Sequence, residues 1–215
     1  MKSTSGPIED RLITDHIEIK RLYDYYNSSL TYKDKQKFYN QIAWELARHA
    51  VAEEIVVYPC IREKVPDGNL LADDAIDDDR KTKQTLSDLN SMDSNSVEFS
   101  EKFRLLMLDI YNHIDKEEKI HIPKMIERIP LDERINLGQK FDNRKLIAPT
   151  RPHPWTADKY PFLETIEGVL LAPIDKFIDL FKSFPESETV KTVTSTSIPT
   201  TSSSSFSQTT SSNKM

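Results

Sequence analysis

The chain has 215 residues, a net charge of −6 and a single cysteine, Cys60. This length suits one helical domain of about 150 residues with a tail. The acidic charge, with no basic block, argues against nucleic acid or anionic lipid as a partner. A lone cysteine cannot form an internal disulfide, which favours a reducing, cytoplasmic compartment. No apolar run reaches the roughly 18 residues of a membrane span, and the opening stretch MKSTSGPIED lacks an apolar signal core.

Long segments with the apolar periodicity of amphipathic helices make up most of the chain, which has only four glycines. The first, 8–30, carries Leu12, His16 and Ile19 along one stripe. In chain order, the remaining helices are predicted at 32–63, 69–92, 96–128 and, shorter, 131–146. The stretches PDG and SMDSNS mark turns between them. The sequence therefore predicts an all-α fold, an antiparallel, up-down four-helix bundle.

The composition changes after this domain, which we place at 7–147. The following segment, 148–184, begins with a linker that contains four prolines and is predicted to be extended. Its second part, 162–184, has an amphipathic pattern and is predicted to be a helical extension that packs on the bundle. A membrane or partner surface is the alternative for this helix. The Ser/Thr-rich stretch 185–215 is too polar to build a core and is predicted to be disordered.

An internal repeat relates the two halves of the predicted bundle. At an offset of 64 residues, the matched pairs are His49 and His113, Glu53 and Glu117, Glu54 and Glu118, and Pro59 and Pro123. At an offset of 63, they are Asp15 and Asp78, and Lys20 and Lys83, with His16 falling on Asp79. The bundle is therefore predicted to consist of two repeated αα-hairpins, each of which offers one polar residue from its first helix and a His-x3-Glu pair from its second.

This arrangement predicts a metal site. Residues i and i+4 of a helix have Cβ atoms about 5–6 Å apart, so His49 and Glu53 can hold one side of a cation. Two such pairs facing across the bundle would put two carboxylates between two metal positions, as in other dinuclear helical bundles. Imidazole and carboxylate together suit iron, manganese or zinc better than calcium. The predicted metal ligands are His16, His49, Glu53, Asp79, His113 and Glu117.

These motifs resemble those of the hemerythrin-like family, the HHE cation-binding domain, and in particular its fungal members. The family pattern, a His followed by two His-x3-Glu pairs, corresponds here to DHIEIK, HAVAEE and HIDKEE. The segment PTRPHPWTADKYPFLETIEGVLLAPIDKFIDLF is similar to the extension that follows the domain in fungal homologues. The resemblance covers residues 7 to about 182 and implies a non-haem di-iron cofactor.

One position departs from the family pattern. The histidine expected on the third helix falls on Asp79, and no histidine lies between residues 50 and 112. Aspartate can ligate through oxygen, which stabilises the ferric state and disfavours reversible O2 carriage. The alternative is that DDAIDDDR is a solvated acidic face with charge at a helix N-terminus. His121, two turns past His113, is either a substitute ligand or a bystander.

Other polar residues near the motifs leave alternatives open. Glu54 and Glu118 are interpreted either as solvent-facing or as neighbours of the ligands. Four tyrosines of the predicted helices are interpreted as core aromatics with a polar tip, one of which could hydrogen-bond a bound oxygen species. They are Tyr23, Tyr26, Tyr58 and Tyr111.

These residues predict a non-haem di-iron protein of hemerythrin type that binds O2, peroxide or nitric oxide, or senses iron or oxygen. A second hypothesis is a metal-sequestering or tolerance protein that holds iron, zinc or cadmium without redox chemistry. A third is a structural interaction module that uses 162–184 and the tail.

The sequence has no catalytic nucleophile signature and no phosphate-binding glycine loop. An enzyme is therefore the less favoured interpretation, although a peroxidase or an oxygenase stays open. The expected partners are metal ions and O2 or related small oxidants.

Overall fold

The computed structural model describes residues 6–148 and Pro185. The described part consists of helices joined by short turns and contains no strand, so the predicted all-α bundle is confirmed. Its elements are α1 (Ile8–Ser28), α2 (Tyr32–Ala52), η1 (Glu53–Val57), α3 (Tyr58–Lys64), α4 (Gly68–Asn90), α5 (Val97–Lys116), η2 (Glu117–His121), α6 (Ile122–Arg128) and α7 (Leu131–Ile147). The predicted extension and tail lie outside the described residues, apart from Ala148 and Pro185, and stay predictions.

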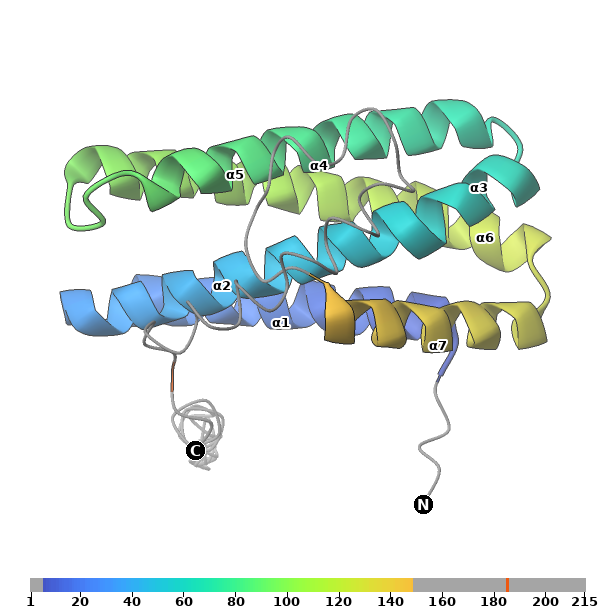
Figure 1. Cartoon of the computed structure of the whole chain (residues 1–215), viewed down its shortest axis with the longest axis horizontal. Coiled ribbons are helices and arrows are strands. Elements are labelled where there is room, and N and C mark those ends of the chain that lie inside the picture. Colours follow the sequence, from blue (N-terminus) through green and yellow to red (C-terminus); the bar gives the residue numbers. More distant parts are fainter. Residues whose placement is uncertain (1–5, 149–184, 186–215) are drawn as a thin grey trace, which may run out of the picture. The chain divides into compact units, whose positions relative to one another are not determined.

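Two hairpins make up the bundle (Figure 1). In the first, α1 packs against α2, and α3 continues the direction of α2; in the second, α4 packs against α5, and α6 continues α5. The connection from α3 to α4 is a tight turn at Gly68, where a Cβ would lie 2.0 Å from the Ile61 carbonyl oxygen. Asp67 beside it takes the left-handed conformation with φ of 59°. This turn passes the chain from the first hairpin to the second.

The two longest predicted helices are each interrupted by a π-helical turn, which the sequence analysis did not predict. In η1, the Tyr58 N–H bonds to the Glu53 carbonyl, five residues back. Pro59 follows directly, and in a regular α-helix its ring would clash with the carbonyl of Ile55, four residues back. The wider turn lets the helix continue through the proline. The second hairpin has the same arrangement. The π turn η2 ends at His121, and Ile122 and Pro123 follow it.

Two apolar clusters fill the bundle, and a polar layer separates them. One cluster includes Tyr58 and Phe141 and involves α3, α6 and α7. The other includes Phe103 and lies toward the turns that join α1 to α2 and α4 to α5. On α1, Leu12 belongs to the first cluster and Ile19 to the second. The buried residue between them is His16, so the polar layer crosses the middle of the bundle.

Helix α7 packs along the first hairpin, against α1, α2 and η1 (Figure 1). Arg134 of α7 forms an ion pair with Glu9 of α1. Gly138 permits a close approach of α7 to the residues that lead into α1, since a Cβ there would lie 2.4 Å from the Gly6 carbonyl oxygen. Phe141 is fully buried and belongs to the first apolar cluster. The short predicted closing helix is thus an integral part of the core.

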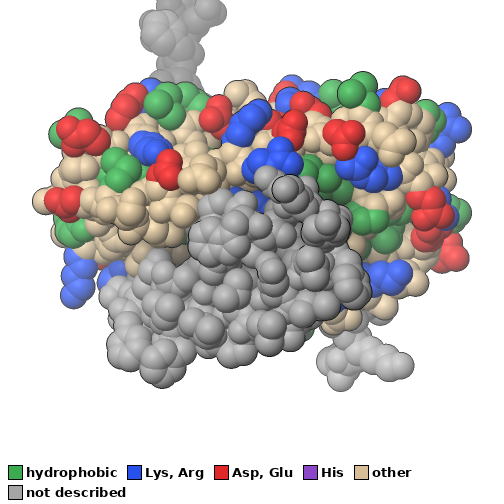
Figure 2. Space-filling model, turned by 45° about the horizontal axis from the view of Figure 1, so that its top comes forward, with side chains coloured by type: hydrophobic (Ala, Val, Ile, Leu, Met, Phe, Trp, Pro, Cys, Tyr) green, Lys and Arg blue, Asp and Glu red, His purple; other side chains and the backbone are tan. Residues whose placement is uncertain are grey.

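The surface of the described part is highly charged. Figure 2 shows acidic and basic side chains intermixed on one face, and no histidine appears on the part of that face that the structure describes. Within the described residues, no helix combines the length and the apolar character needed to cross a membrane.

Candidate metal centre

The bundle brings together all six residues that the sequence predicts as metal ligands. Each comes from a helix or π turn of the core, and none exposes more than 7% of its surface. They form two groups, in each of which one nitrogen or oxygen atom per residue lies within 4.8 Å of the others. The groups are His16, His49, Glu53 and Glu117, and Glu53, Asp79 and His113. Glu53 belongs to both groups.

Helical spacing explains the pairs within each hairpin, and packing brings the hairpins together. Nε2 of His49 lies 3.3 Å from Oε1 of Glu53, one turn along the same helix. In the second hairpin, Nε2 of His113 lies 3.6 Å from Oε2 of Glu117. The same Glu117 oxygen lies 3.1 Å from Nε2 of His16, which belongs to the first hairpin. Glu117 therefore reaches across the bundle toward both groups.

Asp79 occupies the place of the histidine that the family pattern expects on the third helix. One of its oxygens, Oδ1, lies 3.9 Å from Nε2 of His113. The other, Oδ2, accepts a hydrogen bond of 2.8 Å from the Tyr58 hydroxyl. Asp79 is 4% exposed, so it faces the cluster and does not belong to the solvated acidic face that was the alternative interpretation.

Several atoms of the cluster are buried without a hydrogen bond in the described part of the chain. They are Nε2 of His16, Nε2 of His113, Oε1 of Glu53 and Oε2 of Glu117. Leaving a buried polar atom unsatisfied costs about 1–3 kcal/mol, and more where the group is charged. A metal cation among them would accept electron pairs from the nitrogens and the oxygens alike. The residues present therefore fit a cation that takes both imidazole and carboxylate.

In each His-x3-Glu pair, a carboxylate lies beside Nδ1 of the histidine, whose Nε2 faces the cluster. Oδ2 of Asp15 lies 2.9 Å from Nδ1 of His49, and Oδ2 of Asp78 lies 3.8 Å from Nδ1 of His113. When Nδ1 of His49 carries the proton and donates it to Asp15, Nε2 is left as the free electron pair toward the cluster. Lys145 also donates to Asp15 at 2.6 Å and holds it in place.

The glutamates next to the two pairs are also arranged by the repeat. Nζ of Lys83 lies 2.6 Å from Oε1 of Glu54, in a pair whose side chains are 3% and 6% exposed. Its counterpart joins Lys20 to Glu118 at 3.3 Å nearer the surface. Glu118 also lies 3.0 Å from Nδ1 of His16. Both glutamates are thus neighbours of the predicted ligands, and each is paired with a lysine of the opposite hairpin.

The charges of the cluster change one another's pKa values. Burial, together with the Glu117 carboxylate, raises the pKa of Glu53 to about 8. Burial alone would lower the pKa of His113, but Glu117 and Asp78 raise it to about 10. Burial raises the pKa of Asp79 to about 6 against the opposing charge of His113. Both shifts favour the protonated forms of Glu53 and His113 in the metal-free cluster, so a bound cation would compete with these protons.

Some residues in contact with the cluster had only a weak signal in the sequence, or none. The repeat matched Asp15 with Asp78 without revealing that both lie behind a histidine. Tyr58 was one of four tyrosines considered for contact with a bound oxygen species, but the repeat did not single it out, because its counterpart is Ile122. His121 is buried with Nδ1 3.9 Å from Oε1 of Glu117, but it lies outside both ligand groups.

A hollow lined by residues of α4 and α5 reaches His113 of the second group. His113 lines it, together with Asp78, Thr82, Leu106, Asn112 and Lys116. His113 keeps 7% of its surface exposed, whereas His16 of the first group is fully buried. The other histidine of the first group, His49, keeps 5%, so both groups are largely shielded from solvent.

Comparisons with known proteins relate this chain to a cation-binding domain. Residues 8–125 match the Hemerythrin HHE cation binding domain. An uncharacterized hemerythrin-like protein of Schizosaccharomyces pombe is 34% identical over 179 residues, which cover 83% of this chain and 88% of that protein. A DNA nickase of Nostoc sp. is 27% identical over 111 residues, which cover 52% of this chain and 31% of that protein. No solved structure matches.

The domain match spans more than half of the chain and includes all six candidate ligands, while α7 lies beyond it. The match to the S. pombe protein extends over most of both chains. The buried histidines and carboxylates form two groups that could hold a metal ion. The chain therefore belongs to the hemerythrin family, as a protein built on the HHE cation-binding domain.

Proposed function

We propose that this chain is a non-haem di-iron protein of hemerythrin type, which binds O2, peroxide or nitric oxide at the cluster. The observation that carries the proposal is the sharing of Glu53 by the two ligand groups. A carboxylate has two oxygens and can hold two cations side by side, as dinuclear sites in helical bundles require. The histidines favour a transition metal over calcium or magnesium, which prefer oxygen ligands.

The two metal positions are unequal, and this favours oxygen chemistry or sensing over reversible O2 carriage. The first position has two imidazoles, from His16 and His49, whereas the second has one, from His113, with Asp79 in place of another. Carboxylate oxygens are hard donors and stabilise ferric iron, so an oxidised second position would return to the ferrous state less readily. We propose that small molecules approach that position through the hollow beside His113.

The test is to load the purified chain with ferrous iron under anaerobic conditions and then admit air. We expect about two irons per chain and the near-ultraviolet absorption of an oxidised di-iron centre. A variant with both His49→Ala and His113→Ala should lose the iron and the absorption. Glu127→Gln, which changes an exposed glutamate of α6, is the matched control and should behave like the unaltered chain. A folded chain that stays colourless and iron-free would contradict the proposal.

A second candidate function is metal sequestration without redox chemistry. The oxygen-rich second group supports it, because Asp79 and Glu53 would also hold a redox-inert cation such as zinc. Competition between zinc and ferrous iron separates the two functions. Sequestration predicts that zinc displaces iron and that air produces no spectral change. The cytoplasmic location and the absence of a nucleic-acid partner stay predictions.

A further inference from the structure

Tyr58 is a buried phenol that faces the second ligand group. Its side chain has no exposed surface. The hydroxyl oxygen lies 2.8 Å from Oδ2 of Asp79 and 3.3 Å from Oε2 of Glu53. A phenol has one proton, so it can donate to only one of these carboxylates at a time. The hydroxyl oxygen thus lies within hydrogen-bond distance of two candidate ligands of one metal position.

The π turn explains why a residue five positions after Glu53 reaches the same site. In an α-helix of 3.6 residues per turn, position i+5 lies about 140° around the axis from position i. The two side chains would then point in different directions. In η1, the Tyr58 N–H bonds to the carbonyl of Glu53, so the wider turn brings these two residues into line. The backbone irregularity therefore turns the phenol toward the cluster.

The internal repeat places a tyrosine at this position only in the hairpin that faces Asp79. In the second hairpin, the counterpart of Tyr58 is Ile122, which follows η2 in the same way. His16 of α1 faces that hairpin, and its imidazole lies 3.1 Å from the Glu117 carboxylate. The repeat matches His16 with Asp79 of α4, which has a shorter side chain and faces Tyr58. An aliphatic residue thus accompanies the histidine, and a phenol accompanies the aspartate.

We propose that Tyr58 is a further metal ligand, which gives a phenolate oxygen to the position formed by Glu53, Asp79 and His113. This inference rests on the proposed function. The O–H bond of the phenol breaks as the metal–oxygen bond forms, and the proton passes by way of a neighbouring carboxylate to solvent. Phenolate is a hard anionic donor and adds to the oxygen donors that Glu53 and Asp79 offer at this position. It also makes the second position selective for ferric iron.

The experiment uses the visible absorption and resonance Raman spectra of the iron-loaded, air-oxidised full chain, with iron measured in the same samples. Phenolate bound to ferric iron gives a charge-transfer band in the visible region and enhanced phenolate ring vibrations. We expect both in the unaltered chain. Tyr58→Phe, which removes only the hydroxyl oxygen, should lose both and should bind its second iron about 10- to 100-fold more weakly.

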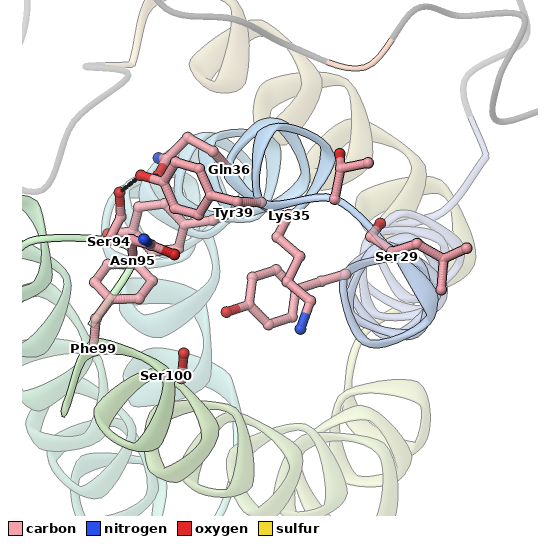
Figure 3. A pocket seen from close by; sticks show the side chains of 12 residues that line it. Ser29, Lys35, Gln36, Tyr39, Ser94, Asn95, Phe99 and Ser100 are labelled. Carbon is pink, nitrogen blue, oxygen red and sulfur yellow. Dashed lines mark hydrogen bonds between the residues drawn. The ribbon is translucent and has the colours of Figure 1, made fainter. Parts of the chain in front are cut away.

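Tyr39→Phe is the matched control, because Tyr39 is also buried but belongs to the second apolar cluster. Its hydroxyl donates to Asn90, and its ring lines a cavity with Lys35, Asn95 and Phe99 (Figure 3). This control should keep the band. Deuterated tyrosine in the unaltered chain should shift the ring vibrations, which tests whether a tyrosine is the ligand even if Tyr58→Phe folds poorly.

The outcomes separate this inference from the proposed function. An oxidised chain that holds iron but lacks the band and the vibrations would overturn the Tyr58 ligand alone. A band that persists in folded, iron-loaded Tyr58→Phe would do the same. A chain that takes up no iron would overturn the proposed function and this inference with it.

Discussion

Asp15 and Asp78 lie behind corresponding histidines, but they hold them unequally. Asp15 is 2.9 Å from His49 and is itself bound by Lys145, whereas Asp78 is 3.8 Å from His113. A carboxylate behind an imidazole fixes its tautomer and makes the other nitrogen a better ligand. We expect Asp15→Asn to weaken iron binding about 10-fold and Asp78→Asn to weaken it less. Competition with a graded series of chelators measures both; a larger loss in Asp78→Asn would contradict this ranking.

Proton binding at the cluster makes the stability of the metal-free protein depend on pH. The pKa of Glu53 rises from 4.5 to about 8 on folding, and that of His113 rises from 6.5 to about 10. Both groups bind more protons when folded, so the stability they contribute is complete below the unfolded pKa and is lost as pH rises through the folded pKa. The melting temperature of the metal-free chain should therefore fall between pH 6.5 and pH 8.

The control for this pH dependence is Glu53→Gln, which resembles the protonated acid and should flatten the fall. Iron should act in the opposite direction, because a cation competes with protons for the same atoms and binds better as pH rises. Thermal denaturation of metal-free and iron-loaded samples across this range measures both effects. A metal-free chain that becomes more stable as pH rises would contradict the assignment.

At the scale of the helices, apolar periodicity predicted where the long segments lie but not how they are wound. The same spacing of apolar residues fits a regular α-helix and an α-helix with one wider turn. The residues of η1 and η2 were therefore predicted as parts of continuous helices. The repeat did contain the signal, because Pro59 and Pro123 occupy the same place after their glutamates. The pairs one turn apart followed from spacing alone. The approach of Glu117 to His16 depends on how the two hairpins pack, which the sequence pattern does not encode.

A substitution of Pro59 tests whether the π turn is needed for iron binding at the cluster. Proline prevents the regular hydrogen bonds around it and so favours the wider turn. Pro59→Ala allows a regular α-helix, in which Tyr58 would rotate away from Glu53. We expect the variant to stay folded, since alanine favours helices, and to bind iron about 10-fold more weakly. Pro130→Ala, at the start of α7, is the control and should bind iron normally. Equal affinities in both variants would contradict the dependence of the site on Pro59.

At the scale of the whole molecule, the polar layer divides the core, and its unsatisfied atoms oppose folding. The six candidate ligands lie between two apolar clusters, so a metal-free chain buries several charged groups without full compensation. The apolar clusters on either side hold these groups in place before any cation arrives. Folding therefore prepares the site, and metal binding in turn stabilises the fold, which is the thermodynamic coupling expected of a ligand that binds only the native state.

Helix α7 links this coupling to a part of the chain beyond the matched domain. The ring of Phe141 lies against the His49 imidazole, with ring centroids 5.7 Å apart. Phe141→Ala should cost about 3–5 kcal/mol of unfolding free energy. It should also weaken iron binding, because it leaves His49 less constrained and admits water beside it.

Leu137→Ala is the matched control, since Leu137 belongs to the same apolar cluster and the same helix. It should lower stability while iron affinity of the folded protein stays unchanged. Urea denaturation and chelator competition on both variants separate the two effects, and equal affinity losses would mean that α7 acts on the site through stability alone.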